Sequence, residues 1–267
     1  MSAFEEHTAV KETGAGVYEG RVHPGWWVVR GPHGGYLAAI ILRALTLRLD
    51  DPSRPARSFT THFASAPEEG PLEITTQIER EGRSMTTLSA RTTQGDKLVA
   101  LSLAAFSAAR EGFDFDDSSV PAVGSPDEGF RVPTEGKDIP DFLGNFDMRW
   151  HIGGPPFSGS PEAQLGGWIR MEDPTIADAP AIACLLDAWP PAVFPRTTKL
   201  VVCPTIDFTV HFRSELPVSG ANGDDFYLGR FTSKLSRDAF FEEDGELWSA
   251  NGTLVAQSRQ LALALNP

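Results

Sequence analysis

The stretch HGGYLAAIILRALTLRL, residues 33–49, determines how the rest of the chain must be arranged. From Gly34 to Leu49 the apolar residues cover a wider surface than the single stripe of a surface helix. The pattern therefore predicts a helix that lies in the core and ends at the pair Asp50-Asp51. The remaining segments must bury this helix.

Four strand-like runs follow the predicted helix, and turns that contain glycine separate them. The runs are RSFTTHFAS, LEITTQIER, SMTTLSARTT and KLVALSLAAFSA. They follow one another without intervening helices, so we expect them to pair antiparallel. One long helix followed by such strands predicts an α+β fold rather than alternating βα units.

From about Glu111 to Pro140 the chain is acidic and rich in proline, glycine and serine, which is typical of a linker on the surface. Beyond it the pattern starts again. FDMRWHI and QLGGWIRM are predicted strands, and DAPAIACLLDAW predicts a second apolar helix with Asp178 as its candidate N-cap. Further strand-like runs close the chain. The predicted organisation is an N-terminal unit over residues 1–112, a linker over 113–140 and a C-terminal unit over 141–267.

Two pairs of matching stretches indicate that the halves are copies of one unit. The pairs are THFASAP at 61–67 with VHFRSELP at 210–217, and GDKLVALSLAAF at 95–106 with GTLVAQSRQLAL at 252–263. The period of roughly 150 residues is too long for a solenoid. An internal duplication, which would give a pseudo-dimer within one chain, is therefore expected.

With these elements in place, the chain resembles the acyl-CoA thioesterase II (TesB-like) family, whose members have the double-hotdog fold. The matching stretches are HGGYLAAIILRAL and SFTTHF in the first half, and LLDAW, PTIDFTVHF and GTLVAQSRQ in the second. The resemblance implies two antiparallel sheets, each wrapped round a long central helix and packed as a pseudo-dimer. It also implies hydrolysis of acyl-CoA to a carboxylic acid and CoA, and a homo-oligomer formed as a dimer of double hotdogs.

Asp187 lies in the otherwise apolar segment AIACLLDAW, where a carboxylate is costly unless it is paired or hydrogen-bonded. Either it points to solvent near the end of the helix, or it faces a polar pocket and activates water there. The resemblance implies the second role, because the family has its catalytic Asp at the position that LLDAW matches. The first helix has only Leu42 or a neighbour at the corresponding place, so one of two ancestral sites is expected to have lost its acid.

Thr205 and Gln260 are predicted to accompany this acid. Thr205 opens the strand PTIDFTVHF, where a β-branched residue also suits a strand start on structural grounds alone. Gln260 lies among small residues on one face of the last strand, with Gln257 on the opposite face, and a buried amide needs partners for its donors and acceptor. In the resembling family the equivalent Thr and Gln hold the water that the Asp activates. There Glu-Gly follows the Gln, whereas Leu-Ala follows it here.

The glycines before the first helix form the other half of the predicted site. A helix N-terminus offers unpaired N–H groups and a partial positive charge, and glycine permits close approach of the backbone. Hotdog units build their site between them, so we expect the N–H of Gly35, with Gly34 beside it, to polarise the thioester carbonyl. The two glycines equally suit a simple turn into the helix. His33 is grouped with them as a substrate-binding residue, and its ring is expected to pack against Trp26 or Trp27.

The composition and the absence of certain motifs argue against several kinds of partner and cofactor. The net charge of −13 argues against nucleic acid or an anionic membrane as the main partner. No apolar run approaches the ~20 residues that span a bilayer, and the start MSAFEEHTAV lacks the pattern of a signal peptide, so a cytoplasmic protein is expected. Cys184 and Cys203 form no CxxC pair, and HExxH, GxSxG, Walker and GxGxxG motifs do not occur, so neither a metal nor a cofactor is predicted.

Two other functions stay open beside the thioesterase. A hotdog protein whose sites have decayed could bind acyl-CoA without hydrolysing it. An enoyl-CoA hydratase shares the fold, but its chemistry uses an Asp/His or His/Glu pair at a helix start, and no DxNPxH-type motif occurs. Hydrolysis is therefore the favoured hypothesis.

Overall fold

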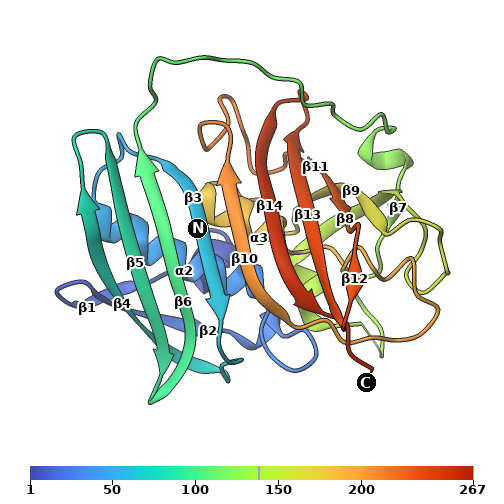
Figure 1. Cartoon of the computed structure of the whole chain (residues 1–267), viewed down its shortest axis with the longest axis horizontal. Coiled ribbons are helices and arrows are strands. Elements are labelled where there is room, and N and C mark those ends of the chain that lie inside the picture. Colours follow the sequence, from blue (N-terminus) through green and yellow to red (C-terminus); the bar gives the residue numbers. More distant parts are fainter. Residues whose placement is uncertain (138, 267) are drawn as a thin grey trace.

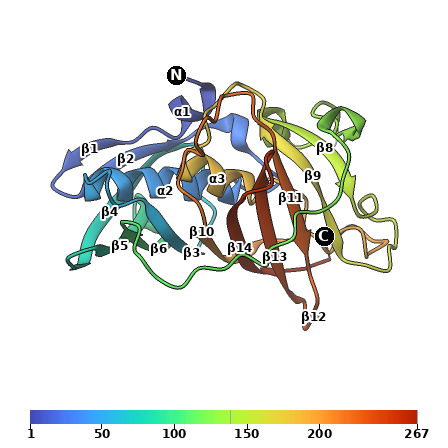
Figure 2. The ribbon, with the colours of Figure 1, turned by 90° about the horizontal axis from the view of Figure 1, so that it is seen from above.

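The structure, a computed structural model, describes residues 1–137 and 139–266. Asp138, in the predicted linker, and Pro267, the last residue of the predicted C-terminal unit, lie outside the described residues. A large antiparallel sheet curves round the helices α2 and α3, which lie side by side on its inner face (Figures 1 and 2). None of the helices in the described residues is long and apolar enough to cross a membrane.

The helices are α1 (Ala3–His7), α2 (Gly34–Leu49) and α3 (Ala179–Leu185), and short 3₁₀ turns span Pro24–Trp26, Pro126–Glu128 and Asp141–Asn145. The strands are β1 (Lys11–Gly14), β2 (Val17–Val22), β3 (Ala56–Phe63), β4 (Gly70–Glu81), β5 (Met85–Gln94), β6 (Lys97–Ser107), β7 (Phe130–Arg131), β8 (Phe146–Ile152), β9 (Gln164–Met171), β10 (Thr205–Phe212), β11 (Tyr227–Thr232), β12 (Ser236–Arg237), β13 (Phe240–Ser249) and β14 (Leu254–Leu263). The predicted α+β class is confirmed.

The helix α2 has the bounds that its apolar pattern predicted. His33 caps its first turn, and Asp50 ends it in the left-handed region at φ 50°. Almost every residue from Gly35 to Leu45 is buried, because β2, β4 and β5 cover one side of the helix and α3 packs against another. A helix that is apolar all round can only be stable in such a place.

The two predicted antiparallel sheets are not separate, and this part of the prediction is wrong. Within the described residues the strands of both halves join in one 14-stranded sheet, in the order β1-β2-β4-β5-β6-β3-β10-β14-β13-β11-β9-β8-β7 with β12 beside β13. The junction is an antiparallel pair of β3 and β10, in which His62 lies opposite Asp207 and Ser58 opposite His211. Each half would otherwise expose the backbone N–H and C=O groups of an edge strand, and the junction pairs them.

The second helix is also shorter than its sequence predicted. α3 has only seven residues and ends at Leu185. Beyond it the N–H of Asp187 donates to the backbone carbonyl of Cys184 at 3.2 Å. This bond spans three residues, as in a turn, and not the four of an α-helix. Pro190 disfavours helical geometry for the residue before it, so the chain leaves the helix. Asp187 therefore lies in the turn just after α3 rather than within a long helix.

The segment predicted as a linker, 113–140, is not wholly outside the sheet. It passes over the rim of the molecule between β6 and the C-terminal half (Figure 1). Near its end Phe130 and Arg131 form the short edge strand β7, which pairs with β8. Most of the described residues of this segment are exposed, and its composition carried no signal for this two-residue strand.

Asp178 connects the two helices, and its loss should be measurable. Its carboxylate caps α3 by accepting the N–H of Ala181 at 2.9 Å, and it lies 3.0 Å from the guanidinium of Arg43 on α2. We expect Asp178→Ala to lower the free energy of unfolding by about 1–2 kcal/mol, mostly through the lost cap. Urea denaturation of Asp178→Asn is the matched control. Asparagine keeps the cap and loses the ion pair, so a loss equal to that of the alanine variant would contradict the capping explanation.

Candidate active site

Asp187 lies against the N-terminus of α2, although 152 residues separate it from Gly35 along the chain. The N–H of Gly35 donates to the Oδ2 atom of Asp187 at 2.6 Å. A Cβ atom on Gly34 would lie only 2.9 Å from the same oxygen, so the carboxylate packs directly on the glycine backbone. The start of the first helix and the acid of the second half thus form one cluster.

His33 holds the turn that carries this acid. Its Nδ1 atom accepts the N–H of Tyr36 at 3.2 Å, so the ring proton is on Nε2. Nε2 donates to the backbone carbonyl of Asp187 at 2.8 Å and lies 3.3 Å from the carboxylate. The ring stacks on Phe142 at 5.0 Å and lies 6.3 Å from Trp26. His33 is therefore an N-cap residue that fixes the position of Asp187.

The surroundings of Asp187 make its carboxylate a stronger base than an exposed one. Its side chain is only 11% exposed. Burial raises the pKa of Asp187, while His33 and the N–H of Gly35 offset part of the rise. A raised pKa means that the carboxylate binds a proton more readily at neutral pH. This is the property that a general base requires.

Thr205, Gln260 and Glu243 form a chain of hydrogen bonds that ends at Ala192, in the segment after α3. The hydroxyl of Thr205 donates to Oε1 of Gln260 at 2.9 Å, and Nε2 of Gln260 donates to Oε1 of Glu243 at 2.8 Å. The N–H of Ala192 donates to the other oxygen of Glu243. Gln260 faces inward and is 8% exposed, whereas Gln257 lines the outer face of the sheet. The two polar residues that the sequence grouped together are thus in direct contact.

The acid and this chain are neighbours without direct hydrogen bonds. The negative charge of Asp187 contributes to the raised pKa of Glu243. Among the described residues no hydrogen bond joins Asp187 to Thr205 or Gln260. The structure therefore joins Asp187 to Gly35 and Thr205 to Gln260 by hydrogen bonds. In the part of the chain that the structure describes, the two groups are linked only by the electrostatic interaction of Asp187 with Glu243.

The hydrogen-bond partner of the Gly35 N–H is not the one expected from the sequence. This N–H group was expected to face a substrate carbonyl, but it donates to the Asp187 carboxylate. The partial positive charge at the start of a helix attracts the nearest anion, and here that anion is part of the protein. An oxyanion would have to compete with Asp187 for this N–H group.

Sequence reasoning missed Glu243. It is 3% exposed and lies opposite Gln260 in the pairing of β13 with β14. The signal was present in FFEEDGE, because strict alternation places Glu243 on the same face as Phe241 and Leu247. A carboxylate on an apolar inward face should be treated as a candidate site residue in its own right.

The first half has no equivalent polar chain. Ala104 on β6 pairs with Leu88 on β5, as Gln260 on β14 pairs with Glu243 on β13. Both apolar residues are buried. With THF of β3 aligned on VHF of β10, these are corresponding places in the two halves. At these two positions, therefore, the second half has polar side chains where the first half has apolar ones.

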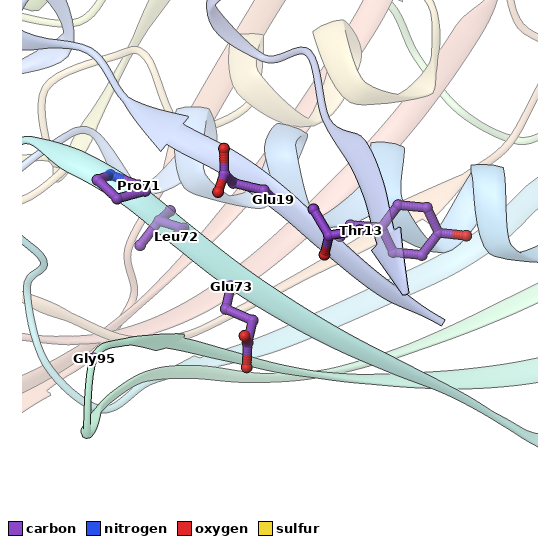
Figure 3. A pocket seen from close by; sticks show the side chains of 7 residues that line it. Thr13, Glu19, Pro71, Leu72, Glu73 and Gly95 are labelled. Carbon is purple, nitrogen blue, oxygen red and sulfur yellow. The ribbon is translucent and has the colours of Figure 1, made fainter. Parts of the chain in front are cut away.

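Two hollows lie away from this cluster. One of about 150 Å³ lies beside β1, β2 and β4 (Figure 3), where Glu19 and Glu73 are paired residues of β2 and β4 and no basic side chain contributes to the lining. The other, of about 520 Å³, lies on the outer face of the sheet, where Arg230 is already paired with Glu246 and Arg259 with Asp244. Neither hollow offers the combination of base and oriented polar groups found at Asp187. No cluster of three His, Cys, Asp or Glu side chains suited to a metal ion occurs in the described part of the chain.

Comparisons with known proteins agree with this geometry. The model of the acyl-CoA thioesterase N-terminal domain matches residues 23–107, and that of the C-terminal domain matches residues 118–264. No curated protein sequence matches the chain.

The fold is found in solved structures along the whole chain. A conserved hot dog fold protein of unknown function from Alicyclobacillus acidocaldarius is 25% identical with a TM-score of 0.90, over 100% of this chain and 99% of that one. A protein of Thermobifida fusca YX, provisionally assigned as a thioesterase II, is 26% identical with a TM-score of 0.84, over 99% and 98% of the two chains. The acyl-CoA thioesterase II TesB2 of Mycobacterium marinum has the same fold at 20% identity and a TM-score of 0.80, over 99% of each chain.

A hotdog fold with this pair of domains defines a thioester hydrolase. The chain belongs to the acyl-CoA thioesterase family.

Proposed function

We propose that this protein hydrolyses acyl-CoA to a free carboxylic acid and CoA, with water activated by Asp187 and oriented by Thr205 and Gln260. The observation that carries the proposal is the buried carboxylate of Asp187, held at 2.6 Å by an amide of the other half of the chain. A carboxylate with a raised pKa in this place is suited to remove a proton from water.

In the proposed reaction the Asp187 carboxylate takes one proton from water as the water oxygen attacks the thioester carbon. The carbonyl oxygen becomes an oxyanion. Once Asp187 is protonated, it is a weaker hydrogen-bond acceptor than the oxyanion. The N–H of Gly35 can then donate to the oxyanion instead, and the missing side chain of Gly34 leaves room for the substrate to approach. The tetrahedral intermediate then expels the CoA thiolate, which takes the proton from Asp187. His33 keeps the acid in place throughout.

We propose the double-hotdog arrangement, with units over 1–112 and 141–267 and a linker over 113–140, as the frame of this site. The pairing of β3 with β10 is symmetric about Thr60 and Thr209, which lie opposite each other with their hydroxyl oxygens 3.0 Å apart. His62 and His211, which match in the sequence, lie at equal distances on either side. Such a register supports a pseudo-two-fold axis at this junction. The cytoplasmic location and the dimer of double hotdogs stay predictions.

The purified protein should release free thiol from acyl-CoA. A panel of acyl-CoA thioesters of different chain length, assayed with a thiol-detecting reagent, is the direct test. Crotonyl-CoA is assayed in parallel for loss of its double bond, which would indicate a hydratase instead. Thermal stabilisation by acyl-CoA without release of thiol would contradict hydrolysis and favour a protein that only binds acyl-CoA.

A further inference from the structure

Glu243 is a buried carboxylate to which the proposed reaction assigns no step. Both of its oxygens accept hydrogen bonds, one from Nε2 of Gln260 at 2.8 Å and one from the backbone N–H of Ala192. No basic side chain forms an ion pair with it among the described residues. The corresponding position of the first half is the leucine Leu88, so the fold itself does not need a carboxylate here.

The charge of Glu243 determines which way the Gln260 amide points. An ionised carboxylate can only accept hydrogen bonds, so it must face Nε2, and Oε1 then faces Thr205. The Thr205 hydroxyl donates its one proton to Oε1 at 2.9 Å. Because its only proton is engaged in this way, the Thr205 hydroxyl can accept a hydrogen bond from the attacking water but cannot donate one to it.

A protonated Glu243 would reverse this chain. The N–H of Ala192 still requires an acceptor, so the carbonyl oxygen of the neutral acid stays on Ala192 and its O–H turns to Gln260. The amide flips, Nε2 donates to Thr205, and the proton of the Thr205 hydroxyl is free to point at the water. Water that donates to both Asp187 and Thr205 keeps both lone pairs for attack, and its two acceptors make the oxygen more nucleophilic. Water that accepts from Thr205 has one lone pair engaged and is a weaker nucleophile.

We propose that Glu243 is a positioning residue, which sets the direction of the hydrogen bonds through Gln260 to Thr205 and so determines whether the attacking water is oriented for reaction. The proposal rests on the function proposed above.

The electrostatic surroundings place this change within the physiological range. Burial raises the pKa of Glu243 to about 7, and the nearby charges of Asp187 and Asp244 contribute to the rise, while the bonds from Ala192 and Gln260 oppose it. Cys203, in the segment before β10, is the other titratable group that interacts with Glu243, and its own pKa of about 12 keeps it neutral. Glu243 is therefore ionised above about pH 7 and protonated below.

The test is the pH profile of kcat for the wild type and for Glu243→Gln. The carbonyl of glutamine would accept from Ala192 and its amide could only donate to Gln260, which reproduces the reversed chain at every pH. We expect kcat of the variant to be about tenfold lower than the wild type at pH 8.5, the effect of one misdirected hydrogen bond. At pH 5.5 the two should have equal kcat. KM should not change, because Glu243 does not touch the substrate. Because Asp187 and Glu243 interact electrostatically, the two proteins are compared at pH 5.5, where Glu243 of the wild type is neutral, and at pH 8.5, where it is ionised.

Glu246→Gln is the matched control, because this carboxylate lies on the same strand but on the outer face, paired with Arg230. Its kcat ratio to wild type should not vary with pH. A wild type that releases no thiol overturns the proposed function. A wild type that hydrolyses acyl-CoA, beside a Glu243→Gln variant with an unchanged profile, overturns only the role of Glu243.

A spectroscopic readout tests the same point without turnover. The NMR resonances of the Gln260 side-chain amide and of the Ala192 N–H should titrate together near pH 7 in the wild type. Resonances that stay constant between pH 5.5 and 8.5 would overturn the proposal even if the glutamine variant failed to fold.

Discussion

Asp187→Asn should lower kcat by about two to four orders of magnitude, the usual contribution of a general base. The amide is nearly isosteric with the carboxylate, and its oxygen can still accept the N–H of Gly35, so the contact between the two halves is kept. It cannot accept a proton from water. The loss should therefore appear in kcat, measured by thiol release under saturating acyl-CoA, with an unchanged fold by circular dichroism.

Asp178→Asn is a suitable control for this variant, since it removes a carboxylate charge only nine residues away, at the start of α3. It should retain nearly full activity. If Asp187→Asn also retained full turnover, the assignment of Asp187 as the base would be wrong, whatever activity the protein has.

Gly35→Ala is expected to have the second-largest effect, on both stability and rate. A Cβ atom at this position would lie 2.8 Å from Cβ of Asp187, 2.9 Å from Cε1 of His33 and 3.0 Å from Cα of Cys184. All three neighbours belong to the packed junction of α2 with the turn after α3, so at least one must move. We expect a loss of about 1–3 kcal/mol in the free energy of unfolding. Displacement of the acid by even part of an ångström should lower kcat by up to about a hundredfold.

Gly112→Ala provides the comparison, because nothing lies within 4 Å of a Cβ atom built there. Its melting temperature and kcat should equal those of the wild type. Should Gly35→Ala behave in the same way, the close packing of Asp187 on the start of α2 would not matter for the site.

Local sequence was sufficient for the elements and for part of the site. The apolar pattern predicted a helix over about residues 34–49, which matches α2, and Asp178, the candidate N-cap, does cap α3. Alternation along β14 distinguished Gln260 from Gln257. These features depend on periods of 3.6 and 2 residues, which the backbone geometry of one segment imposes on its own side chains.

The relations between distant segments required the three-dimensional structure. The strands β3 and β10 join the halves in one sheet, α3 stops before Asp187, and Glu243 completes the chain from Thr205. The N–H of Gly35 is already bonded to an acid 152 residues further along the chain. Such contacts are set by how the two halves pack, and no periodicity within either half specifies that packing. Apart from Glu243, the residues of the candidate site could therefore be proposed from the sequence, whereas their partners, and the direction of their hydrogen bonds, follow from tertiary contacts.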